Sequence, residues 1–185
     1  MRTLFKIIKK WLPIAVATAS LSMLVYLTAQ QSLRQGANDP QIQMAEDTAQ
    51  TLNAGGSIGS VLPADKVEIA NSLAPFMMIF DNSGNVLGSS ATLHGAVPAY
   101  PSGVLDYARK NGEDQVTWQP EAGVRMATVA VRYNNGIVIA GRSLREVEIR
   151  ETNMENISVA AMFAILAVTL IIVIPDELLS TKKFV

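Results

Sequence analysis

The sequence predicts an α+β fold, in which an antiparallel sheet with flanking helices is held between two transmembrane helices. Three observations support this prediction. Two long apolar blocks without any ionisable residue lie near the two ends of the chain. Between them, short runs rich in β-branched and aromatic residues are separated by turn sequences. Other segments carry apolar residues at helical spacings of three and four, so helices and strands are expected in one domain.

The two apolar blocks, residues 11–29 and 157–175, are each close to the roughly 20 residues that a helix needs to cross a bilayer. A cleaved signal peptide is the alternative for the first block, because a basic leader precedes it and Ala29 ends a small-residue cleavage site. The apolar region of a signal usually has about 7–15 residues, so an uncleaved anchor is favoured. A buried core helix is the alternative for the second block, but that block is apolar on every face.

Basic residues precede the first block and follow the second block. By the positive-inside rule they place residues 1–10 and the tail 176–185 in the cytoplasm and residues 30–156 outside, in a two-pass protein of the plasma membrane. The absence of cysteine suits a prokaryotic envelope. The basic residues form no clustered patch in the external domain, which disfavours nucleic-acid binding. The flanking basic residues are Arg2, Lys6, Lys9, Lys10, Lys182 and Lys183.

Helical patterns occur in three parts of the external domain. After the first span, the helix is expected to continue outward and to restart or kink at Pro40, with one narrow apolar face up to Asn53. A weaker pattern predicts a short helix over residues 64–73. A third helix is expected over residues 102–111, with Ser102 as its cap and Gly112 as its stop.

Strand patterns predict a hairpin around the polar turn at residues 81–85, followed later by three antiparallel strands at 115–119, 124–133 and 137–142. Ser143 and Glu146 then have the spacing of a capping box. They predict an exit helix over residues 143–156 that continues into the second span without a break before Pro175.

Two stretches carry a resemblance to a known family: FDNSGNVLGSS at residues 80–90 and GIVIAGRSLREVE at residues 136–148. With the order helix, hairpin, short helix, three strands and exit helix, residues 30–156 resemble the single Cache or PAS-like sensor domains of bacterial and archaeal membrane receptors. The resemblance implies helices on one side of an antiparallel sheet and a small-molecule pocket over its other face. No output module follows the second span here, so signalling would need a partner.

Six polar or aromatic residues are the candidates for contacting a small organic anion or amino acid, because pockets of this kind combine aromatic walls with a few directed charges. For Trp118 and Tyr133 the alternative is a place in the core. For Arg125 it is an ion pair or solvent, and for Arg142 it is a bond to the exit helix or to lipid headgroups. The six candidates are His94, Tyr100, Trp118, Arg125, Tyr133 and Arg142.

The sequence does not indicate an enzyme, a metal site or a cofactor. His94 is the single histidine, and no nucleophile-elbow, zinc-protease or phosphate-loop motif accompanies it. Asp81 and Asn82 are interpreted as turn residues, with cation binding as the alternative. Two functions remain. The first is a membrane-anchored sensor that binds a small molecule and signals through a protein partner or a homodimer; the second is an accessory membrane subunit that scaffolds a partner protein.

Overall fold

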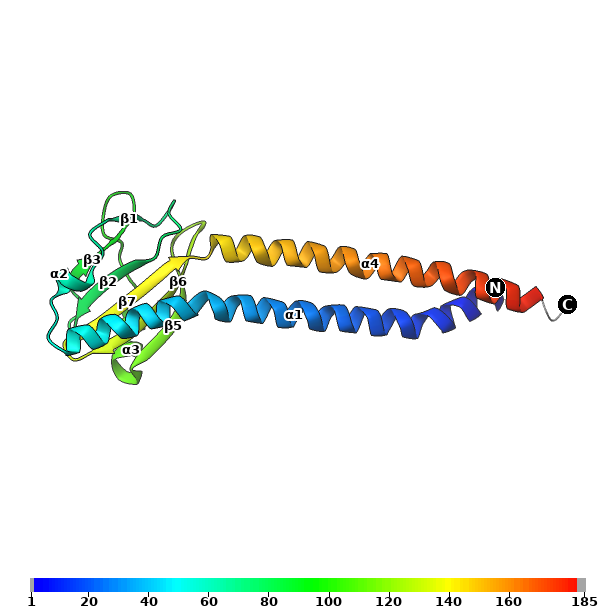
Figure 1. Ribbon diagram of the computed structural model, residues 1–185, viewed down its shortest axis with the longest axis horizontal. Helices are drawn as coiled ribbons and strands as arrows, with labels where there is room; N and C mark the ends of the chain where they lie inside the picture. Colours follow the sequence, from blue (N-terminus) through cyan, green and yellow to red (C-terminus); the bar gives the residue numbers. More distant parts are fainter. Residues whose placement is uncertain (1, 183–185) are drawn as a thin grey trace. The chain divides into compact units, whose positions relative to one another are not determined.

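A computed structural model describes residues 2–182 of the 185-residue chain (Figure 1). The chain divides into two units. Residues 33–148 form the unit that contains the sheet, and the apolar parts of the two long helices form the other. Each unit is described by itself below.

A five-stranded antiparallel sheet forms the centre of the first unit, with the strand order β3-β2-β7-β6-β5. The last strand in the sequence therefore lies in the middle, where it pairs with β2 along one side and with β6 along the other. The α+β class and the antiparallel sheet of the prediction are confirmed. The strands are β2 (Phe76–Asp81), β3 (Val86–Ser89), β5 (Glu113–Glu121), β6 (Val124–Tyr133) and β7 (Gly136–Ser143).

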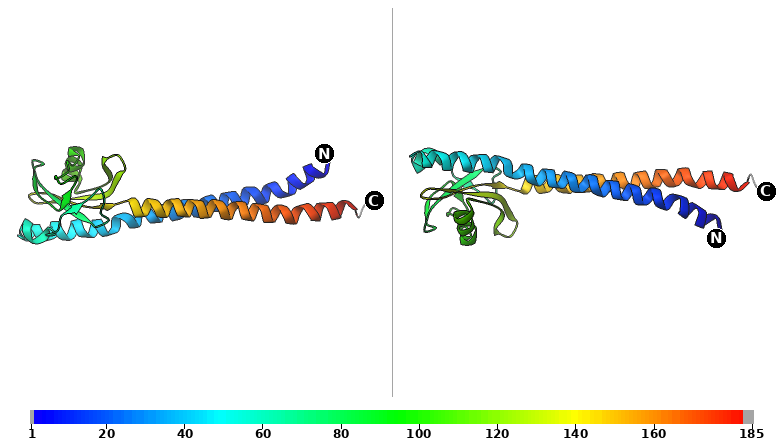
Figure 2. Two further views of the ribbon diagram at one scale, coloured as in Figure 1. Left: turned by 90° about the horizontal axis from the view of Figure 1, so that it is seen from above. Right: turned by 90° about the horizontal axis from the view of Figure 1, so that it is seen from below.

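Alternate side chains of the strands enter two separate cores, one on each face of the sheet. On one face, Met78 and Ile139 pack with Leu105 and Ala108 of α3 (Ser102–Asn111). On the other face, β2, β6 and β7 pack against Ala45 and Ala49 of α1 (Arg2–Asn53). Figure 2 shows α3 and this part of α1 on opposite faces. The expectation of helices on one side only is therefore wrong.

Helix α1 runs through Pro40 without the expected restart. A proline inside a helix removes one backbone hydrogen bond and strains the preceding turn. Burial of the apolar face in the following turns offsets that cost, since Ala45 is 0% exposed and Ala49 is 4% exposed. The sequence pattern located the apolar face correctly but gave no measure of this burial.

The segment 64–73 is not the predicted helix. It contains β1 (Val67–Glu68), which pairs in parallel with β4 (Ala91–Thr92), and bends and turns around it. Val67 and Ile69 are both buried in the core beside α3, and their spacing of two is the period of a strand. The short helix nearby is α2 (Ile58–Val61), where the Ser57 hydroxyl accepts a hydrogen bond from the Ser60 amide.

The ends of the later elements agree closely with the sequence. Helix α3 spans the expected residues and stops at Gly112, whose φ of 96° favours glycine. Its N-cap is Pro101, however, and Ser102 is the first helical residue, so the predicted cap is wrong. Strand β6 covers the predicted residues, and β5 and β7 are longer than expected.

Helix α4 (Arg145–Lys182) begins two residues after Ser143, whose hydroxyl accepts a hydrogen bond from the Arg145 amide at 3.2 Å. The hydroxyl of Ser143 therefore bonds to the amide of Arg145 instead of forming the predicted capping box with Glu146. The helix has no break before Pro175, as predicted, and continues through it. Helices α1 and α4 are each long and apolar enough to cross a membrane, and their most apolar windows are not buried within the protein. That exposure argues against a buried core helix for residues 157–175.

In the second unit the two helices run side by side in opposite directions. Trp11 Nε1 donates a hydrogen bond to Thr169 Oγ1 at 3.0 Å, and Lys10 forms an ion pair with Asp176 at 3.3 Å. Residues early in α1 thus contact residues late in α4, which is the register of an antiparallel pair. The ion pair lies outside the two apolar blocks, and both of its side chains are exposed.

Candidate functional site

Two of the six candidate residues, Tyr100 and Trp118, come together in an aromatic cluster on the α3 face of the sheet. Their ring centroids are 5.0 Å apart in an edge-to-face arrangement. Phe76 lies 6.2 Å from Trp118, and Phe80 lies 6.1 Å from Tyr100. Tyr100 and Trp118 are only 9% and 5% exposed. Their side chains therefore belong to the packed core between the sheet and α3.

The hydroxyl group of Tyr100 gives this cluster one polar contact. It lies 2.8 Å from the hydroxyl of Thr128, which in turn donates to the carbonyl oxygen of Val116 at 3.1 Å. Burial raises the pKa of Tyr100 to about 12; the hydrogen bond with Thr128 opposes this effect and the charge of Asp114 adds to it. The phenol therefore stays neutral and can exchange hydrogen bonds with an entering polar ligand.

Tyr133 is buried in the other core, on the α1 face, with Val129 and Val138. Burial, followed by the charge of Asp81, raises the pKa of its hydroxyl. Tyr133 and Trp118 thus belong to opposite faces of the sheet and do not line one pocket.

Arg125 lines a small cleft of about 70 Å³ at the first turn of α4. Its guanidinium forms an ion pair with Glu148, and its carbonyl oxygen accepts a hydrogen bond from the Leu144 amide at 2.9 Å. On the other wall, Arg145 donates to the carbonyl oxygen of Asn71 at 3.1 Å. The contacts around the cleft therefore connect β6 and the loop after β1 to the first turn of α4. The side chains of both Arg125 and Arg145 are exposed.

His94 lies in a turn with a φ of 53°. Its side chain is exposed, unlike the buried side chains of the aromatic cluster. Its Nε2 is 2.8 Å from Glu121 Oε2, and this hydrogen bond and charge raise the pKa of the imidazole. The carboxylate of Glu68 accepts from the amides of His94 and Gly95 at 3.1 Å and 3.3 Å. The contacts fasten this turn to β1 and to the end of β5.

Arg142 is half-buried, and its alternation with Val138 and Ala140 along β7 places it on the α1 face. Its Nε is buried without a hydrogen-bond partner among the residues that the structure describes, as is Oε1 of Gln41 in α1. Sequence reasoning did not select Gln41, because nothing in the helical pattern distinguishes a buried glutamine from a solvated one. It also missed Glu148, since its pairing with Arg125 depends on the tertiary fold.

The carboxylate of Asp81 is used within its own turn. It accepts hydrogen bonds from the amides of Ser83 and Asn85, both at 2.8 Å, and from the side chain of Asn85 at 2.8 Å. The side-chain and backbone bonds from Asn85 lower its pKa. Among residues 2–182, no group of three or more histidine, cysteine, aspartate or glutamate side chains is placed to hold a metal ion.

The fold and these sites define an α+β domain attached to two helices of membrane-spanning length. Comparison with known proteins found no matching family, no matching curated protein and no matching solved structure.

Proposed function

We propose that this chain is a membrane-anchored extracytoplasmic sensor, which binds a small organic molecule and passes a shift through α4 to the second span. The observation that carries the proposal is the direct joint between the sheet and α4. Strand β7 ends at Ser143 and α4 begins at Arg145, so only Leu144 lies between the last strand and the helix that carries the second apolar block.

Several contacts hold the first turn of α4 to the rest of the sheet unit. The Leu144 amide bonds to the backbone of β6, and the first turn of α4 carries the ion pair from Glu148 to Arg125. Arg145 reaches the loop after β1. A ligand that moves β6 or this loop therefore displaces the start of a helix, and a helix transmits the displacement along its axis because its backbone bonds are all internal.

The aromatic cluster is the ligand site that this proposal favours. Tyr100 lies in the loop before α3, outside regular secondary structure, and loops change conformation at lower cost than strands. Its movement would open an apolar space with a neutral hydroxyl pair at Tyr100 and Thr128. The order of elements, helix, hairpin, short helix, three strands and exit helix, also supports the Cache or PAS-like assignment.

The test uses the full chain in lipid nanodiscs with one spin label at an introduced cysteine, Asn153→Cys in α4, since the native chain has no cysteine. Small organic anions and amino acids are first screened for thermal stabilisation. A compound that stabilises the protein should also change the mobility or distance signal of the label. Arg125→Gln should weaken that change, and the exposed control Lys110→Gln should retain it. A stabilising compound with no effect on the label contradicts the proposal, as does a complete absence of stabilisation.

An accessory membrane subunit is the second candidate, and the packed aromatic cluster favours it. With Tyr100 and Trp118 in mutual contact, the core needs no ligand to be complete. Such a subunit should co-purify from crosslinked native membranes with one protein at fixed stoichiometry, whether or not small molecules are present. Purification of the chain alone from crosslinked membranes would exclude this function.

A further inference from the structure

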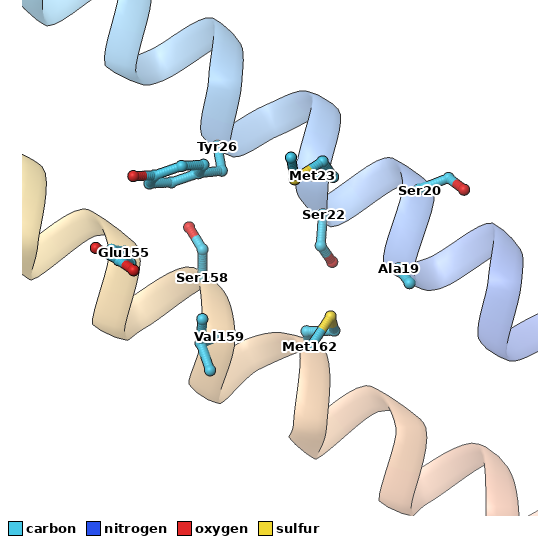
Figure 3. Close-up of a pocket in the computed structure, with 9 residues that line it drawn as sticks. All are labelled: Ala19, Ser20, Ser22, Met23, Tyr26, Glu155, Ser158, Val159 and Met162. Carbon is cyan, nitrogen blue, oxygen red and sulfur yellow. The ribbon is translucent and has the colours of Figure 1, made fainter.

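A groove of about 550 Å³ lies between α1 and α4 within the unit formed by their apolar parts (Figure 3). Its two ends differ in chemistry. Tyr26, Glu155 and Ser158 supply a phenol, a carboxylate and a hydroxyl at one end, and Figure 3 shows the Ser158 hydroxyl directed toward α1. The rest of the groove is its apolar part, lined mainly by Met23, Val159, Met162 and Ala19, with the hydroxyls of Ser20 and Ser22 beside them.

The side chains at the polar end of the groove are not hydrogen-bonded to other residues in the part of the chain that the structure describes. Within residues 4–36 and 38–176, whose side chains the structure describes, no hydrogen bond or ion pair engages the side chains of Tyr26, Glu155 or Ser158. Two threonine hydroxyls of the same helices instead bond to the backbone: Thr28 donates to the Leu24 carbonyl at 2.8 Å and Thr169 to the Leu166 carbonyl at 2.9 Å. The phenol of Tyr26, the carboxylate of Glu155 and the hydroxyl of Ser158 are therefore open to a partner from outside the chain.

The depth of these groups identifies where that partner comes from. This step rests on the proposed membrane function. Tyr26 is near the outer end of the first span, residues 11–29, and Glu155 lies two residues before the second span, residues 157–175. Both therefore lie at the outer headgroup level, where aromatic residues are enriched. The apolar part of the groove extends from there toward the bilayer centre.

We propose that this groove binds a phospholipid with a primary ammonium headgroup, of the phosphatidylethanolamine class. The Glu155 carboxylate accepts hydrogen bonds from the ammonium, and the hydroxyls of Tyr26 and Ser158 donate to the phosphodiester. One acyl chain lies along Met23 and Met162. A second copy of the chain fits less well, because a symmetric contact would bring its Glu155 toward this one and the two carboxylates would repel.

Native mass spectrometry of the full chain, released from detergent with added lipid, tests the proposal. Phosphatidylethanolamine, phosphatidylcholine and phosphatidylglycerol of equal chain length are compared. Phosphatidylcholine keeps the positive charge but has no N–H donor, and phosphatidylglycerol has no cation. We expect phosphatidylethanolamine to be retained at least about fivefold more than either, which corresponds to about 1 kcal/mol. Glu155→Gln should abolish the preference, and Glu146→Gln, which removes the same charge in the first turn of α4, should not.

Three results would overturn the proposal: equal retention of phosphatidylethanolamine and phosphatidylcholine, an unchanged preference in Glu155→Gln, or a protein dimer that carries no lipid. Ser158→Ala is a second variant, expected to reduce retention without affecting the folded domain. Alkaline carbonate extraction of native membranes distinguishes a failure of the lipid site from a failure of the proposed membrane function. A chain that stays in the membrane but shows no lipid preference contradicts only the lipid site, whereas a chain that is extracted contradicts membrane anchoring itself.

Discussion

The hydroxyl of Tyr100 links the aromatic cluster to alkaline stability. Its pKa is about 12 in the folded protein, against an ordinary value of 10.0. The unfolded chain therefore loses this proton at lower pH than the folded chain, and stability is full below pH 10 and falls as pH rises toward 12. The shift corresponds to about 2 to 3 kcal/mol.

Tyr100→Phe should remove this part of the alkaline loss and cost about 1 kcal/mol at neutral pH, because one buried hydrogen bond disappears. Chemical unfolding of the full chain, followed by near-ultraviolet circular dichroism between pH 8 and 12, measures both effects. Tyr107→Phe is the control, since Tyr107 is 54% exposed. Parallel alkaline curves for wild type and Tyr100→Phe would contradict the burial of a neutral phenol.

His94 is the only histidine, so its imidazole gives a single resolved titration by proton NMR. The hydrogen bond and charge of Glu121 raise its pKa above 6.5. The pair therefore supports the fold at low pH, and its contribution is lost as pH rises through the raised pKa. Glu121→Gln should move the midpoint down toward the ordinary value. Glu113→Gln, at the other end of β5, should leave it in place; an identical midpoint in wild type and Glu121→Gln would show that the contact is absent in solution.

At the residue scale, the sequence indicated which residues belong to a candidate site better than it indicated the contacts that each of them makes. It selected Tyr100 and Trp118, and the structure brings them together. It could not place Tyr133 on the opposite face from Trp118, because that depends on the register of β5 against β6, in which Trp118 pairs with Met126. The ion pair of Arg125 was weighed as an alternative, but its partner Glu148 is 23 positions away and is brought near only by the β6–β7 hairpin.

The turn between β6 and β7 depends on a glycine for space. A Cβ at Gly136 would overlap the carbonyl oxygen of Phe80 and lie 3.0 Å from the Cα of Asp81, because β2 passes close to the turn. Both neighbours are backbone atoms of a central strand. Gly136→Ala is therefore expected to destabilise the domain by about 3 kcal/mol or more, at the upper end of overpacking effects.

Gly103 supplies the matched control for this substitution. A Cβ there meets nothing within 4 Å, and the residue is in α3. Gly103→Ala should therefore be neutral or stabilise the domain by up to about 1 kcal/mol, since alanine has less conformational entropy to lose. Thermal unfolding of the two variants beside wild type measures both. Equal melting temperatures for Gly136→Ala and Gly103→Ala would mean that β2 does not approach the turn as described.

Elements with strong local signals were predicted almost to the residue. Strand β6 and helix α3 have regular patterns and glycine or asparagine at their ends, so local chemistry determines their limits. The segment 64–73 was mistaken for a helix because Val67 and Ile69 are held by pairing with β4, more than 20 residues later in the chain. Pairing at that distance leaves no mark in a local pattern.

At the scale of the whole chain, membrane topology is the property that most needs a direct measurement. The absence of cysteine makes single-cysteine labelling unambiguous. A cysteine at Ser83, in the exposed β2–β3 turn, should react with an impermeant maleimide in intact cells, and one at Leu4 should react only after the membrane is opened. Labelling of Leu4→Cys in intact cells, or protection of Ser83→Cys there, would contradict the two-pass orientation.

The central place of β7 determines when the sheet can close. Strand β2 exposes its Met77, Met78 and Ile79 edge until β7 arrives to pair with it, and β7 is the last strand to be synthesised. At about 5–20 residues per second, the hairpin of β2 and β3 waits several seconds in an incomplete state. The apolar part of α4 follows β7 at once. If the chain is anchored as proposed, closure of the sheet and entry of the second span into the membrane are nearly simultaneous events in biosynthesis, and a chaperone that shields β2 would act in the interval before them.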